Sequence, residues 1–514
     1  MDFKQEHICV SLCERNVDAL AKAIKKSAGV GLVEIRVDCL NHETLKSGFE
    51  HIRNLLLNSP APAIVTFRPA EEGGASSADF ETRGAFWIEQ GFGTASHLCD
   101  LEIELAEHFG RTVGTASTQI DWSRVICSYH DFNGVPSDLK QVYERLAATP
   151  ARILKLAVAV RDATECVDLF QLLDRARGDG REMIALGMGA AGLSTRILGP
   201  SRGAFLTYAA LDEKSATAPG QVTVDELHTL YRIDQIDQQT RIMGVVGLPV
   251  AHSLSPHVHN AALGAASINA VYIPLEVSDL ASFVKRMIHP RTREVDWNVL
   301  GLSITAPHKT TVMDYLDWVD PVCTEIGAVN TVIVEDEKLC GYNTDANALI
   351  ETLTVKLGSL KKAQVAVIGA GGATSAALHG LRQQGASTTV FARDVNKAKI
   401  MARKFGANSK SLSEATFEGF DAVINATPLG TVGKFEAATP ATANQLRGAR
   451  LAYDLVYNPI ETRFLREARA AGCQTIGGLS MFISQAAEQF RLWTGAKAPQ
   501  DVMYLAAEKA LKRK

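Results

Sequence analysis

Short apolar runs and longer amphipathic segments alternate along the chain up to Thr240. The gaps between the runs hold helix-like patterns, for example at Val17–Ser27, Ala78–Gln90, Ser137–Ala148 and Cys166–Ala176. The runs are apolar on both faces, which is typical of parallel strands covered by helices. Eight strands alternating with helices within about 240 residues predict an α/β fold of the (β/α)8 type, a TIM barrel. The predicted strands are Ile8–Leu12, Leu32–Val37, Ala63–Phe67, Cys99–Ile103, Val125–Tyr129, Ile153–Val158, Met183–Gly187 and Ala204–Thr207.

Polar side chains break the apolar pattern near the ends of these predicted strands. The carboxyl ends of the strands form the active-site face of such a barrel, so a polar residue there needs an explanation. Taken singly, each has a structural reading: a salt bridge, a snorkelling lysine or a structural histidine. Their occurrence on successive strands favours one shared site. The candidates are Glu34, Arg36, Arg68, Glu102, His130, Lys155 and Arg196.

Lys155 is the most informative of these residues because its neighbours in the sixth predicted strand are apolar. Burial, together with the nearby cations Arg36, Arg68 and Arg196, favours the neutral amine over the ammonium ion. A neutral amine can form a Schiff base with a ketone. His130, at the end of the neighbouring strand, is placed to move a proton on the carbon beside the imine.

A polar stretch from Arg232 to Thr240 ends the first pattern, and a second α/β pattern begins at Arg241. Polar clusters in its loops offer hydroxyl, amide, ammonium and carboxylate groups. Such a set suits a small polyhydroxylated acid, with Lys309 and Asp345 as a candidate proton-transfer pair. Taken singly, each cluster reads as an ordinary turn. The predicted strands of this lobe are Ile242–Gly247, Val271–Leu275, Val299–Thr305 and Val329–Val334.

The stretch from Ala363 to Leu378 predicts a Rossmann-type dinucleotide site, because a strand leads into glycines and then into a helix. Gly369 permits the tight turn, Gly371 lets a pyrophosphate approach the backbone, and the helix presents its N-terminus to the anion. A glycine fingerprint alone is weak evidence, but the strand before it and the helix after it strengthen the prediction. The predicted contacts are Gly369, Ala370, Gly371, Gly372, Ala373 and, in a later loop, Thr427.

The end of the next predicted strand, Thr388–Ala392, bears on the type of cofactor. An NAD site usually has a carboxylate at this strand end. Here Arg393, with Lys397 one turn further, suits the 2′-phosphate of NADP. Asp394 argues in the other direction. The sequence therefore favours NADP over NAD.

Composition narrows the classes of function. A net charge of −4 over 514 residues gives no reason to expect nucleic acid or a membrane surface as partner. No apolar run reaches the ~18 residues of a membrane span, and the first predicted strand begins too early for a transit peptide. Nine scattered cysteines without a CxxC pair favour reduced thiols over a zinc site or a disulfide framework. We therefore expect a cytoplasmic protein without a metal.

The first half resembles type I 3-dehydroquinate dehydratase over nearly its whole length. The motifs that carry the resemblance are Glu34-Ile-Arg36-Val-Asp38, Thr66-Phe-Arg68, Asp100-Leu-Glu102, Ser128-Tyr-His130, Lys155, Ser194-Thr-Arg196 and Ala218-Pro-Gly-Gln221. The resemblance implies that Lys155 forms the Schiff base, that His130 is general base and acid, and that Glu72 orients His130. It implies as substrate ligands Glu34, Arg36, Arg68, Arg196, Thr217 and Gln221. The chain departs from the usual pattern in having Thr195 before Arg196, Thr217 in the lid, and Tyr208 where phenylalanine is usual.

The second half, from Val246 to Trp493, resembles shikimate dehydrogenase. The resemblance implies that Lys309 and Asp345 are catalytic. It implies as substrate ligands Ser253, Ser255, Thr305, Asn330, Asp345, Tyr457 and Gln485. The family often has asparagine where Ser303 stands, and Asn-Arg-Thr where Ala392-Arg-Asp394 stands. The paired serines, Ser253 and Ser255, favour shikimate over quinate as substrate.

The whole chain thus resembles bifunctional dehydroquinate dehydratase/shikimate dehydrogenase. The resemblance implies dehydration of 3-dehydroquinate to 3-dehydroshikimate, followed by reduction to shikimate with NADPH. Two alternatives stay open: a class I aldolase-like barrel fused to a quinate dehydrogenase, and a chain in which one half has become a binding or regulatory module. The expected division is a barrel at 1–233, a linker at 234–240, a shikimate-binding lobe at 241–345, a Rossmann lobe at 346–475, and C-terminal helices at 476–514 that return to the substrate lobe.

Overall fold

The computed structural model of the protein describes residues 7–27, 29–41, 54–55, 62–90, 97–111, 120–218 and 220–512. Contacts within the chain divide it into two compact units. The first holds the residues up to Thr240 together with 273–288 and 292–297, and the second holds the others from Arg241 onward. Among the described residues, no helix is long and apolar enough to cross a membrane.

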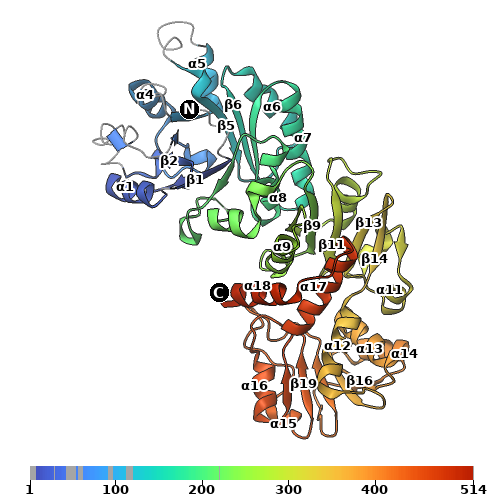
Figure 1. Ribbon diagram of the computed structural model, residues 1–514. Coiled ribbons are helices and arrows are strands. Elements are labelled where there is room, and N and C mark those ends of the chain that lie inside the picture. Colours follow the sequence, from blue (N-terminus) through green and yellow to red (C-terminus); the bar gives the residue numbers. More distant parts are fainter. Residues whose placement is uncertain are drawn as a thin grey trace. The chain divides into compact units, whose positions relative to one another are not determined.

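The first unit contains an eight-stranded parallel sheet (Figure 1), in the order β7-β6-β5-β4-β3-β2-β1-β8. An isolated bridge between Met183 and Ala204 nearly closes the sheet into a barrel, so the predicted (β/α)8 fold is confirmed. The strands are β1 (Ile8–Leu12), β2 (Leu32–Arg36), β3 (Ala63–Thr66), β4 (His97–Glu102), β5 (Val125–Asp131), β6 (Ile153–Ala159), β7 (Glu182–Met188) and β8 (Thr207–Ala209). The helices among the described residues include α1 (Val17–Lys26), α4 (Phe80–Gln90), α5 (Ile103–Arg111), α6 (Leu139–Ala148), α7 (Cys166–Gly178) and α8 (Leu193–Leu198).

Two layers of side chains fill the inside of this barrel. The first is an apolar cluster to which most strands contribute, and which includes Cys9, Leu32, Ile64, Leu98, Ile126 and Ile153. Because strand side chains alternate between two faces, the residue two positions further along faces the same interior. The second layer is therefore polar, and all of its members are buried: Ser11, Glu34, Thr66, Asp100, Ser128 and Lys155.

The last barrel strand lies later than predicted. The apolar run Ala204–Thr207 overlaps β8 at Thr207 alone. Parallel pairing with β1 decides its position, because Cys9 stands opposite Tyr208 and Val10 opposite Ala209. Tyr208 consequently belongs to the barrel wall and faces its interior.

After the barrel, the chain forms a six-stranded sheet in the order β10-β9-β11-β13-β14-β12. Its strands belong to the second unit, except for residues 273–276 at the end of β10. Four of its strands were predicted: β9 (Arg241–Gly247), β10 (Ala270–Glu276), β11 (Val299–Ile304) and β13 (Thr331–Glu335). The sequence reading missed β12 (Trp318–Val319) and β14 (Lys338–Tyr342), which are short and partly exposed. Helices α9 (Ser255–Ala265), α17 (Leu479–Thr494) and α18 (Gln500–Lys512) share one core with this sheet.

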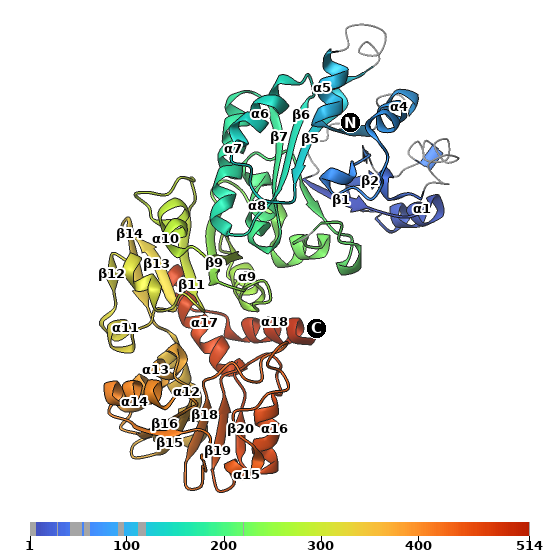
Figure 2. The same ribbon diagram turned by 180° about the vertical axis from the view of Figure 1, so that it is seen from behind.

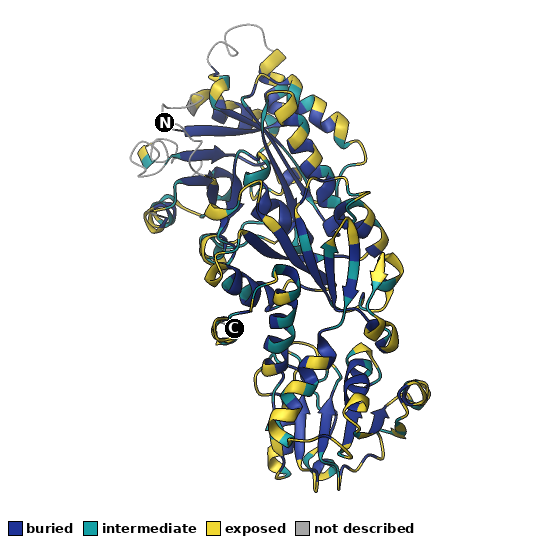
Figure 3. Cartoon of the chain, turned by 45° about the vertical axis from the view of Figure 1, so that its right-hand side comes forward, coloured by how far each residue is buried: buried dark blue, intermediate teal, exposed yellow. Residues whose placement is uncertain are grey.

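A second six-stranded sheet, all parallel, follows in the order β17-β16-β15-β18-β19-β20. On its central strand β15 (Gln364–Ile368), Val365 and Val367 pack with α12 (Asp345–Leu357), α13 (Gly372–Gln383) and α14 (Val395–Phe405). The alternate residues, Ala366 and Ile368, pack on the other face with α16 (Arg463–Ala470). Figure 2 shows these helices on either side of the sheet, and Figure 3 shows its strands buried. This is the doubly wound, Rossmann-like arrangement. Its other strands are β16 (Ser387–Ala392), β17 (Asn408–Ser411), β18 (Ala422–Asn425), β19 (Leu451–Asp454) and β20 (Gln474–Ile476).

One pair of cysteines contradicts the prediction of reduced thiols. Cys13, after β1, and Cys39, after β2, form a disulfide with their Cα atoms 5.3 Å apart. The two residues are 26 positions apart in sequence, but parallel neighbouring strands bring their carboxyl ends together. The seven other cysteines are free, and six of them are buried.

We expect Cys13→Ser to lower the free energy of unfolding by about 3–4 kcal/mol, the loop-entropy contribution of a cross-link of this span. Chemical denaturation measures the change, and Cys340→Ser, at a half-buried free cysteine, is the matched control. Titration of thiols in the denatured chain without reductant should find seven. A count of nine would contradict the disulfide.

Candidate active sites

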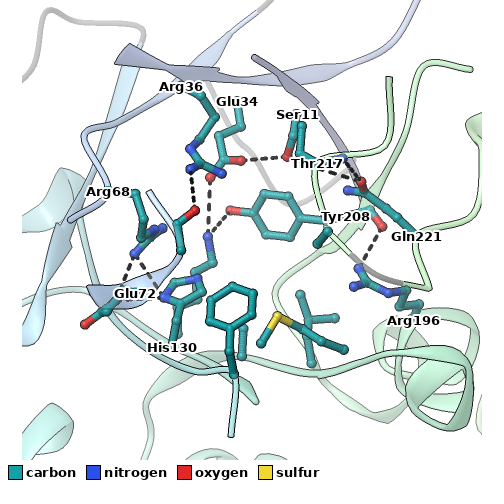
Figure 4. Close-up of a pocket in the computed structure, with 17 residues that line it drawn as sticks. Ser11, Glu34, Arg36, Arg68, Glu72, His130, Arg196, Tyr208, Thr217 and Gln221 are labelled. Carbon is teal, nitrogen blue, oxygen red and sulfur yellow. Dashed lines mark hydrogen bonds and ion pairs between the residues drawn. The ribbon is translucent and has the colours of Figure 1, made fainter. Parts of the chain in front are cut away.

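The polar layer of the barrel opens into a cavity at the carboxyl ends of the strands (Figure 4). Every site residue predicted for the first half lines this cavity, with the exception of Glu102. Glu102 forms a buried ion pair with Arg83 instead, 2.9 Å from Nε to Oε1. The residues brought together are Glu34, Arg36, Arg68, Glu72, His130, Lys155, Arg196, Thr217 and Gln221.

Lys155 lies at the centre of the polar layer and is 3% exposed. Its Nζ lies 2.8 Å from Oδ2 of Asp100, 3.4 Å from Oε1 of Glu34 and 2.9 Å from the hydroxyl of Tyr208. The ring of Tyr208 also faces the amine, with its centroid 4.2 Å from Nζ. The nucleophile candidate is thus held by three oxygen atoms.

The predicted electrostatic surroundings of Lys155 were wrong in one respect. The sequence placed arginines next to the amine, but the polar atoms in contact with Nζ are oxygens. Arg68 instead binds Asp100, 2.9 Å from Nη2 to Oδ2, and Arg36 binds Asp38, 2.6 Å from Nη2 to Oδ2. Buried charges need partners of opposite sign, so each of these cations has taken a carboxylate.

Asp100 connects the lysine to the rest of the site. It accepts hydrogen bonds from Lys155, from Arg68 and from the hydroxyl of Ser128, the last at 2.5 Å. Burial opposes its ionisation, but the charges of Arg68 and Lys155 outweigh burial and hold the pKa of Asp100 well below its usual range. Glu34 behaves similarly: burial is outweighed by Lys155 and Arg36, so its pKa is lowered.

His130 and Glu72 form a second buried pair beside the lysine. The distance from His130 Nδ1 to Glu72 Oε2 is 3.0 Å, and Nη1 of Arg68 lies 3.0 Å from the same Nδ1. Burial, with Arg68 as the next cause, holds the pKa of the imidazole well below its usual value. Burial also raises the pKa of the Glu72 carboxyl to about 8. At neutral pH the pair therefore holds a neutral imidazole, the form that can accept a proton.

Arg196 is the exception to the pairing of buried charges. It is 2% exposed, and Nη1 donates to the carbonyl oxygen of Tyr208 at 3.3 Å. Among the residues that the structure describes, its Nε has no hydrogen-bond partner. Burial lowers the pKa of this guanidinium to about 10, so it stays charged at neutral pH. A buried cation of this kind that lines a cavity is suited to an anionic ligand.

Thr217 and Gln221, which the sequence reading assigned to a lid, line the cavity together with Arg196. Oε1 of Gln221 accepts a hydrogen bond from the backbone N–H of Thr217 at 2.8 Å, and the hydroxyl of Thr217 lies 3.3 Å from the same atom. The threonine in place of the usual serine therefore keeps its hydroxyl at the cavity. Figure 4 shows both residues across the cavity from His130.

A second cavity lies in the second unit. All the substrate ligands that were predicted for the second half line it. The lining includes Ser253, Ser255, Thr305, Lys309, Asn330, Asp345, Tyr457 and Gln485. Nζ of Lys309 lies 2.5 Å from Oδ2 of Asp345, and Nδ2 of Asn330 donates to Oδ1 of Asp345 at 2.8 Å. Asn330 is itself fixed by the backbone N–H of Thr344 at 2.9 Å. Both oxygens of Asp345 are therefore engaged, and Lys309 is directed along its edge of the cavity.

Several lining residues were not among the predicted ligands, although Ser303 and Tyr208 were noted in the sequence as departures from the usual family pattern. In the second cavity Ser303 accepts from the hydroxyl of Tyr272 at 2.7 Å and donates to Gln489 at 2.9 Å. In the barrel, Ser11 donates to Glu34 at 2.6 Å, and Tyr208 contacts the lysine. For Ser11 the signal was present in the sequence, because a polar residue two positions after the apolar Cys9 faces the same interior.

The glycine turn joins β15 to α13, as predicted. Gly369 has a φ of +130°, and a Cβ there would lie 3.0 Å from Oγ1 of Thr374 and 3.1 Å from the carbonyl oxygen of Ala426. A Cβ at Gly371 would meet no atom within 4 Å, so the space beside the turn is open. Ala373, in the first turn of α13, lines the second cavity. The dinucleotide turn and the cavity therefore adjoin each other.

The start of α14 bears on the opposing signals of Arg393 and Asp394. One oxygen of Asp394 accepts hydrogen bonds from the backbone N–H groups of Asn396 at 3.0 Å and Lys397 at 3.1 Å. The carboxylate thus caps the helix. Arg393 and Lys397 are exposed at this strand end. The groups present fit a phosphorylated ribose better than a free ribose hydroxyl.

Comparisons with known proteins divide the chain close to residue 240, where the sequence pattern also changes. The family description "Type I 3-dehydroquinase" matches residues 8–238. "Shikimate dehydrogenase substrate binding domain" matches 245–332, "Shikimate / quinate 5-dehydrogenase" matches 351–444, and "Shikimate 5'-dehydrogenase C-terminal domain" matches 478–508. The chloroplastic bifunctional 3-dehydroquinate dehydratase/shikimate dehydrogenase of Arabidopsis thaliana is 33% identical over 520 residues, covering 97% of this chain and 83% of that protein. The chain belongs to the bifunctional 3-dehydroquinate dehydratase/shikimate dehydrogenase family.

Other relatives of this bifunctional family member match both halves or one. The shikimate biosynthesis protein AroDE of Chlamydia pneumoniae is 28% identical, covering 94% of this chain and 93% of that protein. The NADP(+) shikimate dehydrogenase of Methanococcus aeolicus is 36% identical over 278 residues, which is 52% of this chain and 97% of that protein. A crystal structure of shikimate dehydrogenase in complex with NADP+ matches 54% of this chain and 97% of its own, with 34% identity and a TM-score of 0.50.

We expect the His130 imidazole to stay neutral between about pH 6 and pH 8, because a lowered pKa leaves it unprotonated across that interval. Nitrogen NMR of the labelled full chain measures its protonation. The urea-denatured chain, in which every imidazole titrates near about 6.5, is the reference. A native His130 that gains a proton near that value would contradict the burial argument.

Proposed function

We propose that the barrel dehydrates 3-dehydroquinate to 3-dehydroshikimate, and that the second unit reduces 3-dehydroshikimate to shikimate with NADPH. One observation carries the proposal: a buried amine, a buried His–Glu pair and a buried guanidinium line a single cavity, and among the described residues this guanidinium has no carboxylate partner. Dehydration through an imine needs a nucleophilic amine and a base, and a carboxylate substrate needs a cation that no protein carboxylate has neutralised.

In the barrel, Lys155 condenses with the ketone of the substrate and the ketone oxygen departs as water. The resulting imine acidifies the neighbouring carbon. His130, neutral and held by Glu72, takes the proton from that carbon and then assists departure of the tertiary hydroxyl as a second water. Arg196 binds the substrate carboxylate. Hydrolysis of the imine returns Lys155 and releases the product.

In the second unit, Lys309 donates or steers the proton to the alkoxide that forms when the ketone is reduced. Asp345 holds Lys309 in place at 2.5 Å, and Asn330 fixes Asp345 in turn. The hydroxyls of Ser253, Ser255 and the other polar lining groups bind the substrate. Bound NADPH supplies the reducing equivalent for this step.

The glycine turn and the start of α14 would hold the cofactor. The pyrophosphate fits beside Gly369–Ala373, where the open space at Gly371 and the N-terminus of α13 favour an anion. Arg393 and Lys397 would bind the 2′-phosphate. Thr427, whose hydroxyl donates to Asn425 at 2.6 Å, lies in the loop after β18, which faces the nicotinamide ribose in a fold of this type.

The cytoplasmic location stays a prediction. The disulfide between Cys13 and Cys39 removes the support that nine reduced thiols had given it, since disulfides are rare in the cytosol. Fractionation of cells that produce the chain tests it.

The coupled reaction gives the central test. With 3-dehydroquinate as the only substrate, the full chain should consume NADPH. Lys155→Ala should abolish this consumption, because no 3-dehydroshikimate forms. The same variant supplied with 3-dehydroshikimate should still consume NADPH, which shows that the second unit is intact. Continued turnover of 3-dehydroquinate by Lys155→Ala would contradict the proposal, and a strong preference for quinate with NAD would favour a quinate dehydrogenase.

Cofactor preference tests the reading of α14. Arg393→Ala should raise the KM for NADPH about tenfold or more, since a charge-assisted hydrogen bond worth about 1.5–3 kcal/mol is lost, while the KM for NADH stays unchanged. Asp394→Asn is the matched control: asparagine caps a helix as well as aspartate, so the ratio of the two KM values should not move. A shift of that ratio in Asp394→Asn alone would assign cofactor choice to Asp394.

A further inference from the structure

Tyr208 places a phenol hydroxyl on the amine that forms the Schiff base. The hydroxyl lies 2.9 Å from Nζ of Lys155, and the residue is 4% exposed. Among the described residues, no other hydrogen bond of this hydroxyl is found. In the part of the chain that the structure describes, this hydroxyl is therefore not committed to a second partner.

The three oxygen-bearing groups around Nζ differ in whether they can donate a proton. Asp100 and Glu34 have lowered pKa values and are carboxylates at neutral pH, so they carry no proton. Burial, with Glu34 as the next cause, holds the pKa of the Tyr208 phenol well above its usual range. The phenol is therefore the one group in contact with Nζ, among the described residues, that is both uncharged and a proton donor.

Schiff-base formation needs such a donor at this position. Attack by the amine forms a carbon–nitrogen bond, and the ketone oxygen becomes the hydroxyl of a carbinolamine. That hydroxyl is bonded to the same carbon as Nζ, so it lies within reach of a group 2.9 Å from Nζ. Its carbon–oxygen bond then breaks, and the oxygen must receive a proton to depart as water.

We propose that Tyr208 is a further catalytic residue, which donates its phenol proton to the departing carbinolamine oxygen. The inference rests on the proposed Schiff-base dehydration. The carbon–oxygen bond breaks, nitrogen supplies the electron pair of the new iminium bond, and the products are iminium, water and phenolate. In hydrolysis the phenolate takes a proton from the water that attacks the iminium carbon, which restores phenol and carbinolamine. Protons and charge balance over the cycle.

The phenolate forms next to the iminium cation, so the two opposite charges appear together. The surrounding layer is already arranged for a cation at this point, with Asp100 and Glu34 on the other sides of Nζ. His130 is then left for the proton on the neighbouring carbon. Tyr208 and His130 thus transfer protons at two different bonds of the substrate.

The test uses the exchange of the ketone oxygen, which reports imine formation and hydrolysis alone. The full chain with His130→Ala, without NADPH, is given 3-dehydroquinate labelled with oxygen-18 at the ketone, and mass spectrometry follows loss of the label. Lys155→Ala gives the uncatalysed rate. Adding Tyr208→Phe should slow the exchange about tenfold or more, the scale of general acid catalysis. Phenylalanine keeps the aromatic ring against the amine.

The matched control is Tyr143→Phe in the same His130→Ala background. Tyr143 is a buried tyrosine on helix α6 of the barrel, and it does not line the cavity. Its hydroxyl donates to Asp179 at 2.7 Å. Its exchange rate should equal that of His130→Ala. Borohydride trapping of the imine should be slower with Tyr208→Phe. With borohydride and substrate replenished until labelling stops, it should reach the same final extent, because the reduction is irreversible and Lys155 is still present.

Three outcomes would overturn the role of Tyr208. Equal exchange with and without its hydroxyl would exclude proton donation. Loss of exchange already in His130→Ala would assign the proton to His130. A smaller final extent of trapping would show that the hydroxyl serves packing or amine placement. These outcomes can be told apart from a failure of the proposed function. In that case the unmutated chain would neither dehydrate 3-dehydroquinate nor be labelled at Lys155 by borohydride.

Discussion

The pairing of Lys155 with Asp100, 2.8 Å apart inside the barrel, sets the arrangement of the other polar groups around it. A charge removed from water is stable only when opposite charges and hydrogen bonds surround it. Asp100 therefore also forms an ion pair with Arg68, and Arg68 in turn contacts His130 and Glu72. The imidazole is neutral because it is buried and because the guanidinium beside it disfavours a second positive charge. Arg196, outside the network, is left as the cation that an incoming carboxylate meets.

Much of the barrel could be predicted because parallel strands covered by helices are apolar on both faces, so a charged residue within one stands out. Lys155 and Glu34 were found in that way. The position of β8 was not, because its three residues are too few to show a pattern and their pairing with β1 depends on strands about 200 residues away in sequence. Tyr208 was read only as a tyrosine where phenylalanine is usual, and not as a partner of Lys155.

The other wrong predictions have one physical cause. Residues far apart in the sequence become neighbours in the fold, and the sequence alone does not show which ones. Cys13 and Cys39 meet because β1 and β2 are neighbours, and no spacing rule applies to them. The arginines were expected to surround Lys155, yet Asp38 and Asp100 bind two of them. Arg393 favours NADP and Asp394 favours NAD. The two could be weighed only once the structure showed the backbone N–H groups that donate hydrogen bonds to Asp394. In each case the residue types were read correctly and their partners were missing.

The two layers inside the barrel also connect the folding core with the chemistry. Cys9 and Ser11, Leu32 and Glu34, and Ile153 and Lys155 are pairs in which the apolar member packs and the polar member reacts or supports reaction. A shift of one residue in the register of any such strand would turn both members toward the helices at once. An insertion or deletion within one of these strands would therefore displace a core residue and a reactive group together, whereas one in a loop outside the site would leave the spacing of the reactive groups unchanged.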